Sequence, residues 1–190
     1  IVAALITPGS EVTVTHVGMN PTRTGIFKML EAMGADLTYS NERIVGGEPV
    51  ADITARHSTL KGIDVPPDVA PSMIDEFPIF FVAASMAEGR TITSGLDELR
   101  VKESDRLALM ATGLSAIGVS LEEREDGLIL DGSGGEPFAG GATIASALDH
   151  RIAMSFAVAG QNARTGIMVD DISPIATSFP TFEVMLQSLR

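Results

Sequence analysis

The chain has 190 residues, of which 45% are hydrophobic and only 5% aromatic, and its formal net charge is −12. Such an acidic chain is not expected to bind nucleic acid as its main activity, because a phosphate backbone requires a basic surface. It has no cysteine, which excludes disulfides and thiolate chemistry and suits a cytoplasmic protein, and it has no apolar run of the ~18 residues that a membrane span requires.

The first predicted elements are the end of a helix and a strand. Residues 1–6 are apolar and are followed by Thr-Pro-Gly, a typical helix stop, after which residues 10–15 alternate as in a strand. A helix over 23–33 and strands over 36–40 and 50–56 follow. A domain rarely starts inside a helix, so we expect this chain to be a fragment of a longer protein.

The same order of elements is predicted twice more. The second copy has a helix over 75–88, a strand over 89–94, a helix over 102–117 and strands over 120–123 and 128–130, and the third has a helix over 149–159, a strand over 164–169 and a helix over 179–189. The first helix of each copy is apolar on all sides and is therefore expected to be buried.

Repeated units of this kind bury a core that none could form alone. We expect one α/β domain over 1–190, with buried helices inside and sheets outside. The repeats would span about 1–62, 63–137 and 138–190, with a glycine-rich loop over 132–141 between the last two.

Three polar stretches stand where predicted helices begin. In the first, Asp75 and Glu76 open the apolar helix 75–88. Acidic residues at this end commonly cap the helix and complement its dipole. A carboxylate at the mouth of a buried helix can also serve as a general base, so both interpretations stay open.

The second stretch is LRVKESDRL, residues 99–107. Helical spacing would place Lys102 and Arg106 on one face with Glu103 beside Arg106, and a solvated, salt-bridged surface is the common outcome of such a run. Cations at a helix N-terminus, however, oppose the helix dipole at a cost of about 0.3–1 kcal/mol each. An anionic ligand would reverse that sign.

The third stretch is LDHRIAM, residues 148–154, which places His150 and Arg151 at the start of another apolar helix. His150 is most simply a partly buried, hydrogen-bonded histidine. Arg151 is harder to explain in this way, because arginine is rarely buried without a partner. Two helices that open with cations indicate one shared anion site.

Other candidate motifs are weaker. His16 and His57 have no partners at metal-ligand spacing, so no metal site is predicted. The glycines of 132–135 lack the following Lys and Ser or Thr of a P-loop. No Gly-x-Ser-x-Gly nucleophile motif is present.

The stretches 74–78 (IDEFP), 99–107 and 149–154 (DHRIAM) resemble the three C-terminal signatures of the EPSP synthase family, in the same order and spacing. Residues 19–25, 58–62 and 175–180 are also similar to that family. The resemblance implies two similar domains, each built from three strand-helix-strand-helix-strand-strand units. This chain would be one such domain, and the missing N-terminal domain would be its partner.

The resemblance also implies the reaction, which is transfer of the enolpyruvyl group of phosphoenolpyruvate to the 5-hydroxyl of shikimate 3-phosphate with release of phosphate. Asp75 would be the base for that hydroxyl and a ligand of shikimate 3-phosphate, which Lys102 would also contact. Glu103 would transfer the proton at the methylene carbon of phosphoenolpyruvate. Arg106 and Arg151 would bind its phosphate and carboxylate. No metal or organic cofactor is implied.

Two departures from the family pattern affect these expectations. Thr177 stands where many members have lysine, which removes one expected contact and resembles the branch known for tolerance to glyphosate. The substrate ligands of the other domain are absent, so the isolated chain is expected to bind substrates weakly and to turn over nothing. The alternatives are a non-catalytic complementation module and a UDP-N-acetylglucosamine enolpyruvyl transferase, which shares the architecture but not this motif set.

Overall fold

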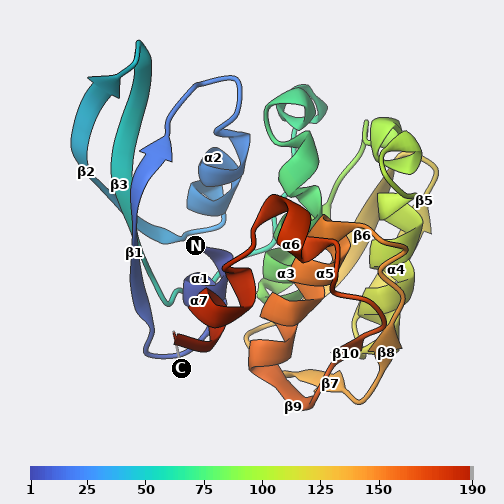
Figure 1. Ribbon diagram of the computed structural model, residues 1–190. Coiled ribbons are helices and arrows are strands. Elements are labelled where there is room, and N and C mark those ends of the chain that lie inside the picture. Colours follow the sequence, from blue (N-terminus) through green and yellow to red (C-terminus); the bar gives the residue numbers. More distant parts are fainter. Residues whose placement is uncertain (189–190) are drawn as a thin grey trace.

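In the computed structural model, which describes residues 1–188, helices occupy the interior and sheets lie around them (Figure 1). Helices α3 (Phe77–Met86) and α5 (His150–Ala159) pack against each other at the centre, and α1 (Val2–Ile6) packs against both. The expected α/β architecture with buried helices is therefore confirmed. None of the described helices is long and apolar enough to cross a membrane.

The first unit continues from α1 into β1 (Glu11–Gly18), α2 (Gly25–Ala32), β2 (Asp36–Val45) and β3 (Glu48–Arg56). Its strands form an antiparallel sheet of order β1-β3-β2, seen at the left of Figure 1. Strands β2 and β3 extend beyond the predicted ranges 36–40 and 50–56. The two-glycine turn between them, with both glycines at positive φ, lengthens the hairpin.

The second unit has the same topology. It consists of α3, β4 (Glu88–Ile92), α4 (Arg106–Ala116), β5 (Ser120–Arg124) and β6 (Gly127–Ser133), with the antiparallel strand order β4-β6-β5. The order of elements along the chain thus repeats, as the sequence pattern predicted, and the structure shows that the order of strands within the sheet repeats as well. The boundaries expected after residues 62 and 137 stay a prediction.

The third unit is built from shorter pieces. Strands β7 (Phe138–Gly140) and β8 (Thr143–Ile144) pair in parallel with β9 (Ala163–Thr165) and β10 (Met168–Val169), and the turn η4 (Gly160–Asn162) joins α5 to β9. The expected single strand over 164–169 is therefore two short strands. The expected loop over 132–141 is also shorter, because β6 and β7 extend into it from either side.

The last predicted helix, 179–189, begins three residues later than expected, and a separate short helix precedes it. The structure has α6 (Ile175–Ser178) and α7 (Phe182–Ser188), and Pro180 lies between them. Proline disfavours a helical conformation for the residue before it, which separates the two helices. Leu189, the expected end of the helix, lies outside the described residues.

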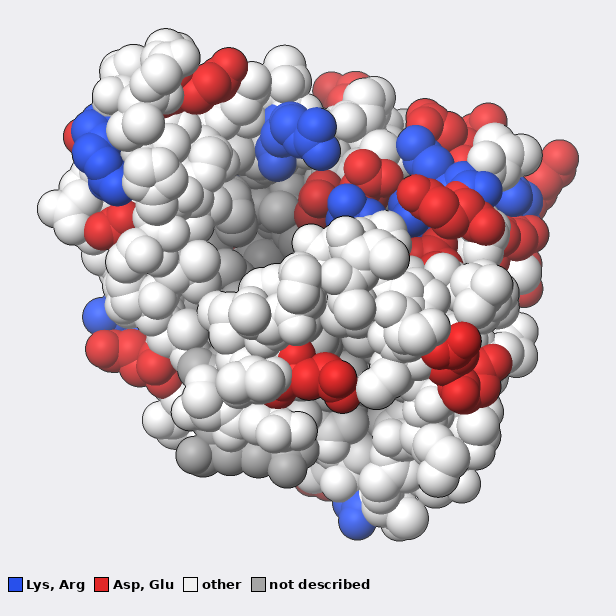
Figure 2. Space-filling view, in the orientation of Figure 1, with Lys and Arg blue, Asp and Glu red and all other residues white. Residues whose placement is uncertain are grey.

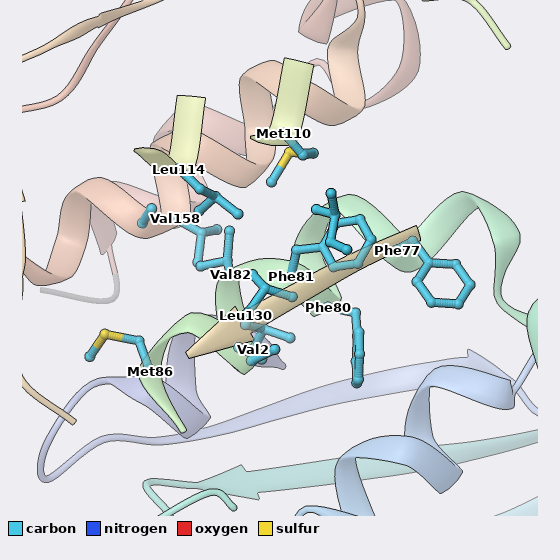
Figure 3. Packing of buried hydrophobic residues seen from close by; sticks show 14 of the residues in the cluster. Val2, Phe77, Phe80, Phe81, Val82, Met86, Met110, Leu114, Leu130 and Val158 are labelled. Carbon is cyan, nitrogen blue, oxygen red and sulfur yellow. The ribbon is translucent and has the colours of Figure 1, made fainter. Parts of the chain in front are cut away.

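The core is centred on α3, which is apolar on every face and buried along its length. The ring of Phe77 lies 5.9 Å from that of Phe80 and 5.7 Å from that of Phe81 (Figure 3). Each buried aromatic side chain contributes about 1.5–3 kcal/mol. Gly113 of α4 is needed for close packing, because a Cβ there would lie 2.3 Å from the ring of Phe156. This rigid core fixes the starts of α3, α4 and α5, where the polar stretches lie.

Candidate active site

The first polar stretch lies in a short 3-10 turn, η2 (Ile74–Glu76), and not in the first turn of α3. The expected helix 75–88 therefore begins two residues later, at Phe77. Glu76 occupies the N-cap position of α3 but its side chain makes no capping hydrogen bond. The capping interpretation is thus not supported by a bond, and the carboxylates of Asp75 and Glu76 make other contacts.

The expected helix over 102–117 also begins later, at Arg106. Asp105 caps α4 by accepting a hydrogen bond from the backbone N–H of Ala108 at 2.9 Å. Aspartate is among the strongest N-cap residues, which explains the start. Lys102 and Glu103 lie before the helix, after the turn η3 (Asp97–Val101). The prediction that Lys102 and Arg106 share a helical face is therefore wrong, whereas Glu103 lies beside Arg106 as expected.

The third stretch forms the start of α5 nearly as expected. The carboxylate of Asp149 accepts a hydrogen bond from the backbone N–H of Arg151 at 2.9 Å and so caps the helix. His150 is only partly buried. Arg151 projects from the first turn of α5 toward the turn η2.

Arg106 is completely buried (0% exposed) and is paired with three carboxylates. Its Nε donates to Asp149 Oδ2 at 2.8 Å and its Nη1 to Asp75 Oδ1 at 3.2 Å. Its Nη2 donates to Glu103 Oε2 at 2.5 Å. A buried guanidinium is tolerated only when it is paired in this way.

Arg151 is bound by the same turn that contacts Arg106. Its Nη1 donates to the backbone oxygen of Asp75 at 2.9 Å and lies 3.5 Å from Glu76 Oε1, and its Nη2 lies 3.7 Å from Asp75 Oδ2. The carboxylate of Asp75 therefore bridges both arginines, with Oδ1 facing Arg106 and Oδ2 facing Arg151. The structure joins Asp75, Glu103, Arg106 and Arg151 in one network, although they are up to 76 residues apart in sequence.

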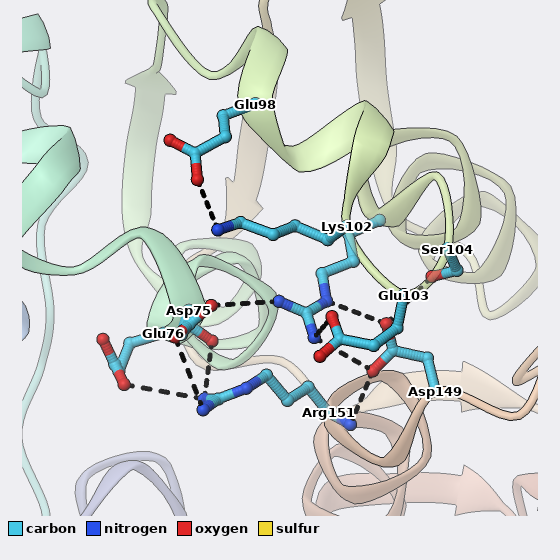
Figure 4. Close-up of polar contacts among 9 residues, drawn as sticks. Asp75, Glu76, Glu98, Lys102, Glu103, Ser104, Asp149 and Arg151 are labelled. Carbon is cyan, nitrogen blue, oxygen red and sulfur yellow. Dashed lines mark hydrogen bonds and ion pairs between the residues drawn. The ribbon is translucent and has the colours of Figure 1, made fainter.

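Among the described residues, Lys102 is the predicted site residue that makes no hydrogen bond or ion pair with this network. Its ammonium pairs with Glu98 at the surface, and the side chain extends toward that carboxylate in Figure 4. The lysine side chain is 24% exposed. Lys102 is thus near the start of α4 but is held by a separate pair.

Thr177 lies in the short helix α6. Its hydroxyl donates to the backbone oxygen of Pro174 at 2.7 Å. The Thr177 side chain is therefore bonded within its own turn and supplies no charge.

Asp149 is the residue that sequence reasoning missed. Besides Arg106, it accepts a hydrogen bond from the hydroxyl of Ser104 at 2.9 Å, and it is 0% exposed. Burial acts to raise the pKa of Asp149, but the hydrogen bonds and charge of Arg106 outweigh it and hold the pKa below its ordinary value. The need of a buried arginine for a partner was the available signal.

The cationic side chains of the cluster are not left unpaired for a ligand. Three cations are present against five carboxylates: Lys102, Arg106 and Arg151 against Asp75, Glu76, Glu98, Glu103 and Asp149. Figure 2 shows basic and acidic side chains interspersed over the segment that leads into α4. A phosphate or carboxylate ligand on Arg106 would therefore compete with the protein's own carboxylates.

Comparison with solved structures defines the class of fold. The enolpyruvyl transferase NikO from Streptomyces tendae has a TM-score of 0.74 with this chain at 18% identity, over 99% of this chain and 40% of that one. EPSP synthase from Acinetobacter baumannii has a TM-score of 0.96 at 50% identity, over 99% of this chain and 43% of that one. The chain forms one domain of the enolpyruvyl transferase fold.

The sequence comparisons identify the family. A profile described as EPSP synthase (3-phosphoshikimate 1-carboxyvinyltransferase) matches residues 1–186. Proteins named 3-phosphoshikimate 1-carboxyvinyltransferase from Sphingopyxis alaskensis and Zymomonas mobilis are 65% and 59% identical over the whole chain. The chain belongs to the EPSP synthase family. It spans 43% and 42% of the length of these two relatives.

Proposed function

We propose that this chain supplies one face of the active site of a 3-phosphoshikimate 1-carboxyvinyltransferase. The complete protein would transfer the enolpyruvyl group of phosphoenolpyruvate to the 5-hydroxyl of shikimate 3-phosphate and release phosphate. The observation that carries this proposal is the bridge from Asp75 to Arg106 and Arg151, in a chain of this family.

The reaction needs groups of two kinds. The 5-hydroxyl oxygen bonds to C2 of phosphoenolpyruvate while a proton is added to the methylene carbon. Loss of that proton and departure of phosphate from C2 then restore the double bond. Carboxylates that gain and lose protons serve the first need, and fixed guanidinium groups that bind phosphate and carboxylate serve the second.

The exchange of partners on Arg106 links these two needs. The Glu103 side chain is 56% exposed and that of Asp75 is 30% exposed, whereas Asp149 is buried behind the arginine. An incoming anion would replace Glu103 and Asp75, while Asp149 would keep Arg106 in place. The two displaced carboxylates would then lie beside the substrate, as proton transfer at the methylene carbon and at the 5-hydroxyl requires.

We assign Lys102 to shikimate 3-phosphate as well, because its side chain lies at the surface beside the network. The rest of the longer protein would complete the site, so the isolated chain is proposed to turn over nothing. A complementation module remains the second reading of the isolated chain. The absence of cysteine also suits the cytoplasmic location that we propose.

Substitution of Arg106 in the full-length protein tests this function. We expect Arg106→Ala to raise the KM for phosphoenolpyruvate by about 30-fold or more, because a buried charge partner is lost, and to change the KM for shikimate 3-phosphate by less than about threefold. Arg106→Lys keeps a charge beside Asp149 but loses the planar fork, so it should show the same selectivity if the alanine variant folds poorly.

Steady-state kinetics with each substrate varied in turn measures both constants. Arg164→Ala is the control, because Arg164 pairs with Glu136 at the surface and both side chains are more than 60% exposed. Equal increases in the two KM values would refute the role of Arg106. A full-length protein without any enolpyruvyl transfer would refute the function itself.

A further inference from the structure

Glu76 contacts the network, but the roles assigned above do not use it. It lies at the end of the turn η2, directly after Asp75, and its side chain is 31% exposed. It occupies the N-cap position of α3 without making a capping bond. Its Oε1 lies 3.5 Å from Nη1 of Arg151, toward which it points in Figure 4. The side chain is thus directed to the arginine and not to its own helix.

The hold of Glu76 on Arg151 differs from that of Asp75. Asp75 binds Arg151 through its backbone oxygen at 2.9 Å, a contact that no ligand can displace without moving the main chain. Glu76 binds only through a flexible side chain at a longer distance. If Glu76 leaves, the backbone oxygen of Asp75 still holds the guanidinium in place, and the guanidinium loses a neighbouring negative charge.

We propose that Glu76 is a positioning residue that occupies the Arg151 guanidinium until an anionic ligand takes its place. It is an internal substitute for the phosphate or carboxylate group that Arg151 binds. The inference rests on the proposed function for the identity of that ligand, phosphoenolpyruvate. The replacement of Glu76 by an anion on Arg151 does not depend on the proposed function, and any small dianion can test it.

The charged groups around Glu76 determine how it responds to pH. Arg151 faces it from α5, Asp75 lies beside it on the same turn, and Arg23 acts on it from the turn before α2. Burial raises the pKa of Glu76, and the negative charge of Asp75 adds to this rise. The positive charges of Arg151 and Arg23 act in the opposite direction. An anion on Arg151 removes the favourable contact and adds a repulsive one, so it raises this pKa further.

Anion binding should therefore be accompanied by proton uptake at Glu76, and affinity should increase as the pH falls. The sign follows from linkage, because the ligand-bound state holds the proton more tightly than the free state. At high pH Glu76 is charged and repels the bound anion, whereas at low pH Glu76 is protonated and does not repel it.

The test is Glu76→Gln in the full-length protein. Glutamine keeps the size and the acceptor oxygen but removes the charge, so we expect a KM for phosphoenolpyruvate about three- to tenfold lower than that of the wild type near pH 8. The turnover number should change by less than about twofold. The two proteins should converge as the pH falls and Glu76 becomes protonated in the wild type. Glu76→Asp retains the charge and should retain the pH dependence.

Glu136→Gln is the matched control, because it makes the same change in a glutamate paired with an arginine at 2.7 Å, with 72% of its side chain exposed. It should change neither the KM nor its pH dependence. An unchanged or higher KM in Glu76→Gln near pH 8 would overturn the proposal.

Calorimetric titration of the same full-length proteins with sulfate separates this inference from the function. Sulfate stays doubly charged over the whole range, so its affinity reports on the protein groups alone. We expect Glu76→Gln to bind it about three- to tenfold more tightly than the wild type near pH 8. Equal sulfate affinity in Glu76→Gln and the wild type would refute the exchange, even if the enzyme is active. Tighter sulfate binding by Glu76→Gln would support the exchange, even if the protein shows no enolpyruvyl transfer.

Discussion

Two of the arginine–carboxylate clusters among the described residues differ in depth and in the elements that they join. The network at the starts of α3, α4 and α5 surrounds Arg106, which is 0% exposed. The second cluster lies on the first sheet, where Asp52 is 3.6 Å from Arg43, whose side chain is 40% exposed. Both contain the same chemical groups, so charge pairing alone does not distinguish a site from a structural feature.

The sheet cluster serves the backbone. Asp52 Oδ1 accepts from the N–H of His16 at 2.8 Å and Asp52 Oδ2 accepts from the side-chain amide of Asn41 at 2.8 Å. Both partners lie where the register of the sheet shifts, in β1 between Val14 and Val17 and in β2 just after Ser40. Asp52 therefore satisfies a polar group that a bulge leaves unpaired.

The network at the helix starts joins elements that are remote in sequence and has more carboxylates than its arginines need. A structural role would require one partner for the buried Arg106, and Asp149 supplies it. The additional, partly exposed carboxylates are the ones that a ligand can replace. This surplus, rather than the charge itself, distinguishes the candidate site from the sheet cluster.

The strongest test of the comparison is removal of the buried partner. Asp149→Ala should lower the free energy of unfolding by about 3–5 kcal/mol, because Arg106 would stay buried with its Nε unpaired. Urea unfolding followed by circular dichroism of the full-length protein would measure the change.

The double variant Asp149→Ala with Arg106→Met provides the control. Replacement of both members of a buried pair by apolar residues is often nearly neutral. We therefore expect the double variant to be more stable than Asp149→Ala alone. Additive losses would show that Asp149 stabilises the fold by a route other than Arg106.

A smaller effect is expected at Asp52. The amide of Asn41 and the backbone N–H of His16 hold the pKa of Asp52 below its ordinary value. A lowered folded-state pKa gives stability that is present above the unfolded pKa and is lost as the pH falls through the folded one. Asp52→Asn should therefore weaken the decline of the urea midpoint below about pH 4. It should leave enolpyruvyl transfer unchanged, and a loss of activity would mean that the sheet cluster is not purely structural.

Much of the fold follows from patterns that are local in sequence. The apolar helices α3 and α5 and the repeated order of strands could be predicted, because period and punctuation are properties of short segments. Helix starts were harder to predict. Helices α4 and α3 begin at Arg106 and Phe77, and in both cases charged residues just before the helix appeared to belong to it.

The site was predictable only in part, because its partners are set by tertiary structure. Motif resemblance brought Asp75, Glu103, Arg106 and Arg151 together, and the structure joins them. Sequence reasoning expected cations awaiting an anion. It could not show that the same turns supply carboxylates to those cations, since the contact between Arg106 and Asp149 spans 43 residues.

The smallest expected effect concerns the backbone that supports each cluster. The four non-glycine residues at positive φ in the described chain are His16 and Asn41 at the sheet cluster and Ala147 and Leu148 directly before Asp149. Leu148 has φ 60° and is 67% exposed, so its side chain gains little packing in return for a conformation that costs about 1–2 kcal/mol.

Leu148→Asn should therefore raise the free energy of unfolding by about 0.5–1 kcal/mol, since asparagine tolerates this conformation. Thermal and urea unfolding of the full-length protein would measure the gain. Val101→Asn is the matched control, because Val101 is also exposed (80%) and apolar but does not have a positive φ. A loss of stability in Leu148→Asn would mean that this exposed leucine packs against a part of the protein beyond this chain. The loop before Asp149 would then be held from outside, unlike the bulge at Asp52, whose bonds all come from its own sheet.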